Sequence, residues 1–354
     1  MFFYLIIFSI LLILAAAEVL LKNKKISILT SGLLAVTAGL RFYTGYDFKP
    51  YQSFYFDLDS MSNVFDGSID AEPGFLLLNY IFKSLGFNFY FFTLFFSAIT
   101  IFLLCKFAYR YTPYPSLILV YYFARFFLVR DMGQIRSALA CIILLYGIPF
   151  VTKKKPIHFL LIVFLASLFH VTAWIFIVAY IFNYVFKTLS LKNVFSLLFL
   201  SLMLGSIVQV PDLYLWAVPE RYIAYFTSPS YTNGQWILNP ILWMQLGLFF
   251  GVSFCVHATE NNEKKKLDIS LKVYLIASLI LIAFGDLGTV GGRLSTLFAT
   301  SEILLVPYLF SNLTKNKLIN ITLFFSFSFM VFCLIFIISG TYIDYVPYQT
   351  IFGL

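Results

Sequence analysis

The chain has 354 residues, of which 61% are hydrophobic, 20% aromatic and only 11% charged, and its formal net charge is +8. Soluble domains carry about a quarter charged residues, whereas this chain repeats apolar runs of ~18 or more residues, each long enough to cross a hydrocarbon core. These features exclude a soluble protein, and the continuous rather than alternating runs exclude a transmembrane β-barrel. The predicted fold class is therefore all-α, a polytopic integral membrane protein. The positive charge indicates basic cytoplasmic loops rather than a nucleic-acid partner.

Apolar helices follow one another along the whole chain, which is predicted to form a single transmembrane domain over 1–354. They are expected at roughly 1–21, 26–43, 88–109, 114–129, 134–151, 193–210, 236–257, 270–288, 293–311 and 318–340. Between Lys155 and Lys187 the chain must leave the lysine-rich side and return, so two short helices are expected to meet near Phe169–His170. The prediction is about twelve membrane segments, with both termini outside.

Lysine clusters orient these segments. They lie at 22–25, 152–156, 187–192, 263–266 and 315–317, and placing all five in the cytoplasm satisfies the positive-inside rule. The segment 74–87 is too short for a standard span. If it crossed the membrane, every later cluster would face outward. It is therefore predicted to be a re-entrant or interfacial helix on the outer side. The outer segments 44–87 and 211–236 are predicted to cover the active-site face.

Arginine is distributed differently from lysine. Fifteen of the seventeen lysines fall on or near the cytoplasmic side in this topology. Six of the seven arginines fall near outer helix ends: Arg41, Arg125, Arg130, Arg136, Arg221 and Arg293. Guanidinium is a planar fork that pairs with phosphate and stays charged. The alternative is that each arginine snorkels or pairs with a local acid, which suits Arg125 and Arg221 but explains the set of six less well.

The segment 128–147 places charges between two apolar runs. Arg130 ends one helix, Asp131 lies in the turn, and Arg136 falls in the first turn of the next helix. A helix N-terminus favours a bound anion, to which Arg136 and Gln134 would add hydrogen bonds. For Asp131 a structural salt bridge with Arg130 or Arg136 is the favoured interpretation. For Arg136 the anion site is favoured, because a cation gains nothing from the positive end of a helix.

A second outer loop has the same character. Its sequence is GDLGTVGGRL, and its four glycines let backbone N–H groups approach a ligand closely. Arg293 is predicted to open the following helix. Glycine-rich turns between membrane helices are common, but the parallel with Arg136 favours a second anion site.

Two carboxylates lie in the first outer segment. Asp47 follows Arg41 in RFYTGYDFKPY, and Glu72 occurs in DAEPGF. The alternative for Arg41 is a helix-capping role, with Asp47 merely solvated. Together with His170, at the junction of the two short helices, these carboxylates are the candidate bases for a hydroxyl group. A lone histidine is usually a packing residue, but at a break between two helices a hydrogen bond to a ligand is as good an interpretation as packing.

Metal and cofactor chemistry is not signalled. The four cysteines lie in apolar runs without a CxxC pair, and no aspartate-rich cluster suits a divalent ion. The predicted site therefore has no metal and no cofactor. The long segment 211–236 is rich in Tyr, Trp and Pro, and such rings either stack on sugars or form an interfacial belt.

The ordered motifs resemble the EpsG family, which belongs with the Wzy-type polysaccharide polymerases of O-antigen, capsule, lipopolysaccharide and exopolysaccharide biosynthesis. The matching elements are RFYTGYD with Tyr51, AEPGF..LN, GQIRSALA, LFHVTA and GGRLSTLF. Each motif is short, so the specificity lies in their order over roughly residues 40–300. The roles transfer best to Arg41, Arg136, His170 and Arg293, and less well to Arg130.

The resemblance implies a metal-independent glycosyltransferase in the bacterial inner membrane. Its donor and acceptor would be undecaprenyl-diphosphate-linked oligosaccharides on the periplasmic face, surrounded by membrane lipids, and a chain-length regulator is a candidate partner. In-line displacement would invert the anomeric configuration. Two alternatives stay open: an O-antigen ligase-like transferase, which differs in its acceptor, and a flippase of lipid-linked sugars. A flippase needs cations at both faces, so the one-sided arginines favour the enzyme.

Overall fold

The computed structural model describes residues 1–229, 231–232, 235–256 and 261–353, and within these it contains helices and no strand. The side chains of Arg221 and of the lysines at 264–266 lie outside the described part. The all-α prediction is confirmed. The chain divides into two compact units: unit 1 comprises 1–146, 164–171 and 310–354, and unit 2 comprises 147–163 and 172–309.

In the part of the chain that the structure describes, six helical segments are long and apolar enough to cross a membrane. They are α1 (Phe2–Leu21), α5 (Phe89–Tyr111), Ile135–Thr152, α12 (Leu191–Val208), Leu267–Phe284 within α15 (Asn261–Phe284), and Lys317–Ile338, which begins with α18 (Lys317–Phe332). A seventh is formed if α16 (Gly288–Ala299) and α17 (Glu302–Ser311), which are bent by 57°, count as one broken span. Four shorter apolar helices lie at Ile26–Gly39, Pro156–Ser167, Val171–Val185 and Pro240–Cys255. The chain is thus a multi-pass membrane protein, while the count of about twelve crossings stays a prediction.

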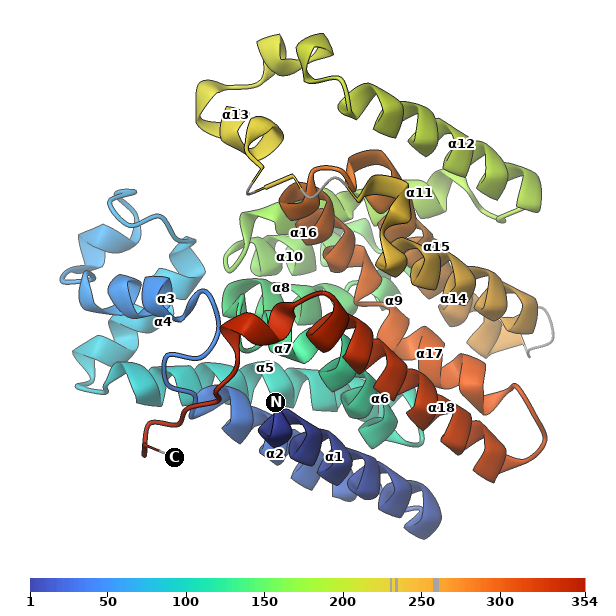
Figure 1. Cartoon of the computed structure of the whole chain (residues 1–354), viewed down its shortest axis with the longest axis horizontal. Helices are drawn as coiled ribbons and strands as arrows, with labels where there is room; N and C mark the ends of the chain where they lie inside the picture. Colours follow the sequence, from blue (N-terminus) through green and yellow to red (C-terminus); the bar gives the residue numbers. More distant parts are fainter. Residues whose placement is uncertain (230, 233–234, 257–260, 354) are drawn as a thin grey trace. The chain divides into compact units, whose positions relative to one another are not determined.

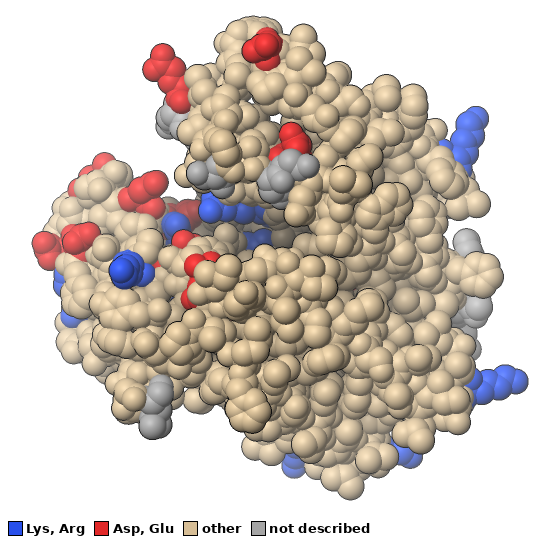
Figure 2. Space-filling model, in the orientation of Figure 1, with Lys and Arg blue, Asp and Glu red and all other residues tan. Residues whose placement is uncertain are grey.

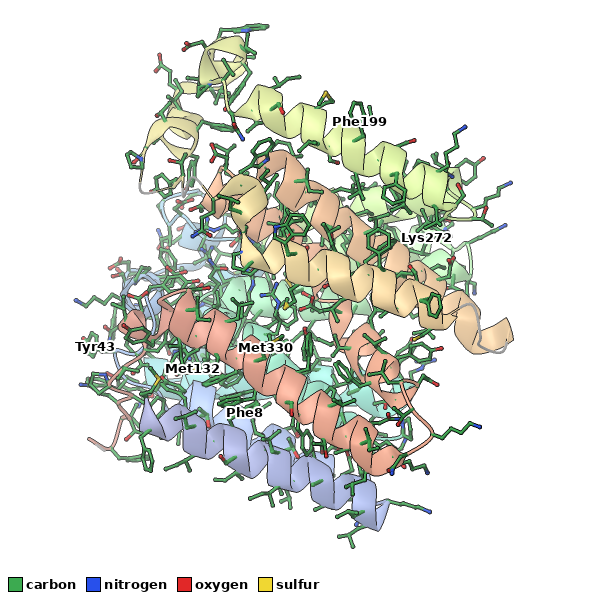
Figure 3. All side chains as sticks on the ribbon, turned by 45° about the vertical axis from the view of Figure 1, so that its right-hand side comes forward. Phe8, Tyr43, Met132, Phe199, Lys272 and Met330 are labelled. Carbon is green, nitrogen blue, oxygen red and sulfur yellow. The ribbon has the colours of Figure 1, made fainter. Side chains whose placement is uncertain are left out.

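Unit 1 is a layered bundle in which α1, α2 (Ile26–Gly39), α5 and α6 (Pro115–Tyr122) pack on one another (Figure 1). The chain continues from α6 through a π-helical turn (Phe123–Phe127) into α7 (Leu128–Arg130). Phe8 of α1, labelled in Figure 3, stacks on both Phe123 and Phe332, with ring centroids 5.9 and 5.3 Å away, and these two rings also stack on each other at 5.9 Å. Offset aromatic stacking of this kind fixes neighbouring helices in a medium where apolar burial alone provides little preference.

Unit 2 is arranged around α15. This helix packs against α16, α12, α14 (Pro240–Val256), α11 (Ile177–Val185) and α9 (Ile148–Thr152). The indole N–H of Trp236 donates to the Ile282 carbonyl of α15 at 2.7 Å, which ties the segment before α14 to this central helix. Unit 2 also holds α13 (Glu220–Thr227), which lies in the long segment between α12 and α14.

The segment 44–87 of unit 1 contains short helices: α3 (Phe48–Phe56), a 3-10 turn (Met61–Val64) and α4 (Pro73–Ser84). Phe75 of α4 packs on Phe92 and Phe96 of α5, with centroids 5.7 and 5.6 Å away. The segment exposes four aspartates, which Figure 2 shows gathered over this part of unit 1: Asp57, Asp59, Asp66 and Asp70. The short helix predicted at 74–87 is confirmed. Its re-entrant or interfacial placement stays a prediction.

The short helices predicted between Lys155 and Lys187 are also present. α10 (Pro156–Ser167) ends just before His170, and a 3-10 helix begins at Val171 and leads into α11. The backbone N–H of His170 still donates to the Ala166 carbonyl at 3.0 Å, so the histidine closes the last turn of α10. His170 therefore lies at the break between two helices, as the sequence predicts.

Candidate functional site

Glu72, Arg136 and His170 come together in unit 1 as one bonded cluster. One carboxylate oxygen of Glu72 accepts a hydrogen bond from Nη1 of Arg136. The other oxygen lies 3.1 Å from Nδ1 of His170 and accepts the backbone N–H of Val171, also at 3.1 Å. The side chains of Glu72, Arg136 and His170 are 13%, 20% and 17% exposed, so the cluster is mostly buried but accessible to a ligand. Residues 64 and 98 positions apart thus form a single site.

The local sequence explains how Glu72 is held. A residue before proline is restricted to extended backbone, and proline suits the first position of a helix. Glu72 accordingly has φ −71° and ψ 144°, and α4 begins at Pro73. Gly74 then donates its N–H to the Leu168 carbonyl at 2.9 Å, and a Cβ at this position would lie only 2.7 Å from that oxygen. Glycine therefore allows α4 to approach the turn that carries His170.

Arg136 is enclosed by aromatic rings. Its guanidinium carbon lies 5.7, 5.5 and 5.8 Å from the ring centroids of Tyr51, Phe54 and Phe75. Guanidinium is attracted to ring faces, and several rings around one charge fix its orientation. Its Nε is buried and makes no hydrogen bond within the described structure. Arg136 is the second residue of α8 (Ile135–Leu145), so its predicted place in the first helical turn is confirmed.

The carboxylate of Glu72 is kept ionised. Burial raises the pKa of Glu72, but the hydrogen bond with His170 and the charge of Arg136 lower it more, and the net pKa lies below its ordinary value. An ionised carboxylate facing Nδ1 favours the imidazole tautomer with its proton on that nitrogen. The Nε2 of His170 is then the ring nitrogen with a free lone pair.

Arg130 and Asp131 hold the turn before α8. Nη1 of Arg130 donates to Oε1 of Gln134 and to the Ser137 hydroxyl, each at 2.5 Å, and Arg130 is only 4% exposed. The Tyr122 hydroxyl donates to Asp131 at 2.6 Å. The predicted position of Arg130 at a helix end is confirmed. Its guanidinium, however, is directed into the turn, where α7 and α8 bury it, and this geometry does not favour direct contact with a diphosphate.

Arg41 lies just after the end of α2, near the predicted helix end, and its side chain is buried. It is 1% exposed, and its Nη1 donates to the Ala38 carbonyl in the last turn of α2. The reason is that the C-terminal segment lies across Arg41. The backbone N–H of Phe42 donates to the Gln349 carbonyl at 2.8 Å, and the backbone of Arg41 forms an isolated antiparallel β-bridge with Thr350. The helix-capping alternative therefore fits the structure better than a direct diphosphate contact.

Asp47 is half-buried at the N-cap of α3. It acts electrostatically on Tyr51, whose ring lies against Arg136. Asp47 is thus linked to the cluster through one intervening side chain, whereas Glu72 and His170 are in direct contact with each other.

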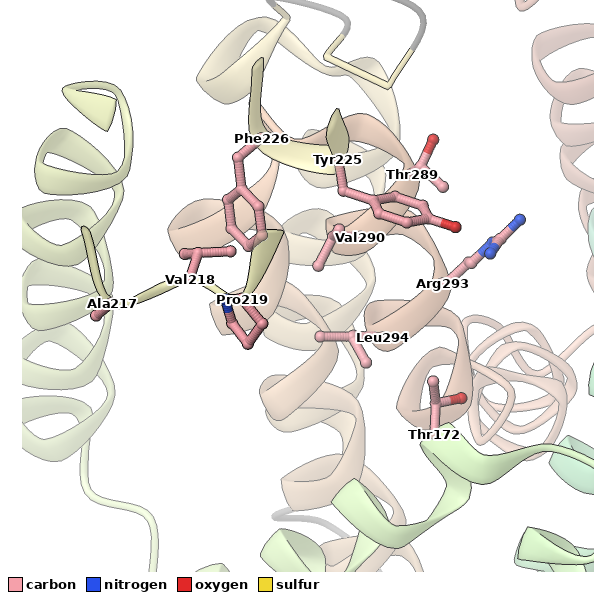
Figure 4. Close-up of a pocket in the computed structure, with 10 residues that line it drawn as sticks. All are labelled: Thr172, Ala217, Val218, Pro219, Tyr225, Phe226, Thr289, Val290, Arg293 and Leu294. Carbon is pink, nitrogen blue, oxygen red and sulfur yellow. The ribbon is translucent and has the colours of Figure 1, made fainter. Parts of the chain in front are cut away.

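Arg293 belongs to unit 2 and lines a pocket of about 420 Å³ (Figure 4). The prediction that it opens its helix is wrong by one turn, because the glycine-rich segment is itself helical and α16 begins at Gly288. Gly291 makes this possible, since a Cβ there would lie 2.3 Å from the Phe284 carbonyl. The hydroxyls of Thr172, Tyr225 and Thr289 line the same pocket. Its other walls are apolar: Ala217, Val218, Pro219, Phe226, Val290 and Leu294.

A model of the EpsG family matches residues 24–350, a range that includes every residue of the candidate site. The chain belongs to the EpsG family. It is 24% identical over 292 residues to the amylovoran biosynthesis protein AmsC of Erwinia amylovora, an alignment that covers 80% of this chain and 77% of that protein. No solved structure matches the chain significantly.

Sequence reasoning missed two parts of this EpsG-family site. The aromatic enclosure of Arg136 was not predicted, although Tyr51, Phe54 and Phe75 flank the two candidate carboxylates in the sequence. The second omission is the C-terminal segment over Arg41. Tyr345 and Tyr348 lie close enough to act electrostatically on Arg41, and the Tyr348 hydroxyl donates to the Thr37 carbonyl at 2.9 Å. No local pattern links positions 41 and 345.

Proposed function

We propose that this membrane protein is a polysaccharide polymerase. It would transfer a growing glycan from undecaprenyl diphosphate to an incoming lipid-linked repeat unit at the outer face of the bacterial inner membrane. Membership of the EpsG family and the likeness to a protein of amylovoran biosynthesis support polysaccharide synthesis. The observation that carries the enzymatic assignment is the bonded cluster of Glu72, Arg136 and His170, because its parts match the needs of glycosyl transfer.

The base in this proposal is His170. Both oxygens of Glu72 are occupied by hydrogen bonds and its pKa is lowered, so it is a poor proton acceptor. It is well placed to orient the imidazole with Nδ1 protonated, which leaves Nε2 to take the proton of the acceptor hydroxyl. Glu72 is then a positioning residue. Asp47, the third candidate base, contacts the cluster only through Tyr51.

In this proposal the guanidinium group of Arg136 stabilises the leaving group, and Arg293 contributes to donor binding. As the acceptor oxygen bonds to the anomeric carbon, the bond from that carbon to the diphosphate oxygen breaks, and the electron pair leaves with the diphosphate. Positive charge placed beforehand around that oxygen lowers the barrier. Arg136 retains donors that Glu72 does not use, and Arg293 lines a pocket with a polar side and apolar walls that suit an amphiphile. Direct displacement inverts the anomeric carbon, and no metal is required for any of these steps.

Arg41 and Arg130 take supporting roles in this scheme. Both are buried, and both donate within unit 1, Arg41 to the end of α2 and Arg130 to the turn before α8. They fix the backbone from which Asp47 and Arg136 project. Gln134 belongs to the same turn, since its side-chain Oε1 accepts a hydrogen bond from Arg130.

The proposal is tested with the purified full-length protein in detergent, given lipid-diphosphate-linked repeat units as sole substrate and a chelator. A ladder of glycans one repeat unit apart is expected. A flippase makes no ladder, because detergent removes the two compartments, and a ligase makes none without its own acceptor. A ladder abolished by the chelator and restored by Mg²⁺ or Mn²⁺ would contradict the metal-independent mechanism. Authentic substrate that stays unextended by folded protein would overturn the polymerase assignment.

A further inference from the structure

Unit 1 contains a second pocket, far larger than the one around Arg293 and unrelated to the Glu72 cluster. It is a groove of about 790 Å³ between α2 and α5. Along most of its length it is lined by small or apolar side chains: Ile28, Gly32, Ala35, Ala98, Ile101 and Phe102. Small residues on facing helices leave an open channel here, and a Cβ added at Gly32 would meet nothing within 4 Å.

One end of the groove is strongly basic. Lys25 lies at the N-cap of α2, and Lys106 and Arg110 lie near the end of α5, and all three line the groove. Lys24 is next to them, with its ammonium 5.0 Å from the Tyr109 ring centroid and 3.4 Å from the Tyr109 carbonyl. In the described part of the chain no acidic side chain pairs with Lys25, Lys106 or Arg110, all of which are exposed.

The combination of an apolar channel and an unneutralised basic end matches an amphiphilic anion. We propose that this groove binds one anionic phospholipid, with an acyl chain between α2 and α5 and the headgroup phosphate at Lys25, Lys106 and Arg110. A basic pocket between transmembrane helices attracts anionic headgroups, at about 1 kcal/mol for each Lys or Arg near the surface. The apolar length of the groove distinguishes this ligand from free phosphate, which would use only the basic end.

The lipid site is separate from the proposed catalytic cluster. α5 has 23 residues, which gives it a length of about 34 Å. The ring of Phe75, which also contacts Arg136, packs on Phe92 and Phe96 near the start of α5, whereas Lys106 and Arg110 lie near its end. The two sites therefore lie toward opposite ends of one membrane-spanning helix, and the lipid site does not depend on the proposed polymerase activity.

Native mass spectrometry of the full chain in detergent, titrated with phosphatidylglycerol or phosphatidylcholine, tests the charge requirement. The double variant Lys106→Gln, Arg110→Gln should bind phosphatidylglycerol about thirtyfold more weakly, the effect of two such charges. The control is Lys315→Gln, Lys317→Gln, which removes the same charge from exposed positions outside the groove, and should change binding less than twofold. Equal loss in both double variants, or equal affinity of the wild type for the two lipids, would overturn the proposal.

A second pair of variants tests the channel itself. Gly32→Leu fills the groove with an ordinary helix-forming side chain and keeps all of the cations, so lipid binding should fall at least about tenfold while thermal stability does not fall. Gly247→Leu is the matched control, because this glycine is also helical, exposed and free of neighbours, but lies on α14. Lipid binding that survives Gly32→Leu would show that the basic end attracts anions without an acyl-chain site. That result would contradict the assignment even if the charge variants behaved as expected.

Discussion

The cluster in unit 1 and the pocket in unit 2 present arginine in opposite ways. Arg136 is bonded to Glu72 and enclosed by three aromatic rings. Arg293 lines a pocket with three hydroxyl-bearing residues and apolar walls, and no carboxylate in the described part of unit 2 is paired with it. One guanidinium has its counter-charge within its own unit, and the other has none in the described part of unit 2.

This difference separates two tasks that the sequence alone assigns to both arginines. A charge fixed by a partner and by rings is preorganised, so it supports a developing transition state without rearranging. A charge in a pocket with apolar walls is available to bind an anionic headgroup whose lipid contacts those walls. Arg136 should therefore act mainly on the chemical step and Arg293 mainly on donor binding.

The largest effect is expected at Glu72. Glu72→Gln removes the charge that orients His170 and pairs with Arg136, so kcat for chain extension should fall by about 10²–10⁴-fold, the range attributed to a general base. The measurement is the initial rate of ladder formation at saturating donor. Asp59→Asn is the control, since Asp59 also pairs with a cation, Lys83, but at the exposed surface. A Glu72→Gln enzyme with more than a tenth of wild-type kcat would remove Glu72 and His170 from the proposed mechanism.

Conservative replacement of the two arginines should separate their roles. Lysine keeps the charge but loses the planar fork. Arg136→Lys should lower kcat by about 10²-fold or more, the cost of one lost oxyanion donor. Arg293→Lys should instead raise the KM for the lipid-linked donor by about tenfold, because one bidentate pair becomes a point contact. After equal membrane insertion of both variants is verified, steady-state kinetics measure whether each substitution changes kcat or KM. If both lower kcat alike, the contrast between the two regions has no functional meaning.

Local pattern was sufficient for the parts of the fold that depend on sequence neighbours. Apolar length predicted the helices, and the turn residues around Arg136 and His170 predicted both helix breaks correctly. The start of α16 was misplaced because glycine usually signals a loop, whereas Gly291 here lets the helix approach the Phe284 carbonyl. A close contact between two segments cannot be predicted from either stretch of sequence alone.

Long-range contacts decided the candidate site. Glu72, Arg136 and His170 were each predicted as site residues, but the bonds that join them follow from packing of α4 on the turn after α10. The burial of Arg41 depends on a C-terminal segment some 300 positions away. Residue type therefore predicted which groups carry chemistry, while tertiary packing determined which of them are paired, open or buried.

The smallest expected effect distinguishes the two regions by pH. Because the folded pKa of Glu72 is lowered, its stabilising contribution is fully present above its unfolded pKa, near 4.3, and is lost as the pH falls through the lower folded value. The difference in thermal midpoint between wild type and Glu72→Gln should shrink as the pH falls from about 5 toward 4 and below. Arg293→Lys, whose charge does not titrate in this range, should show a constant difference throughout. A wild-type advantage that grows between about pH 5 and pH 4 would mean that Glu72 is protonated in the folded protein, and it could then neither pair with Arg136 as a carboxylate nor hold His170 in the tautomer that leaves Nε2 free.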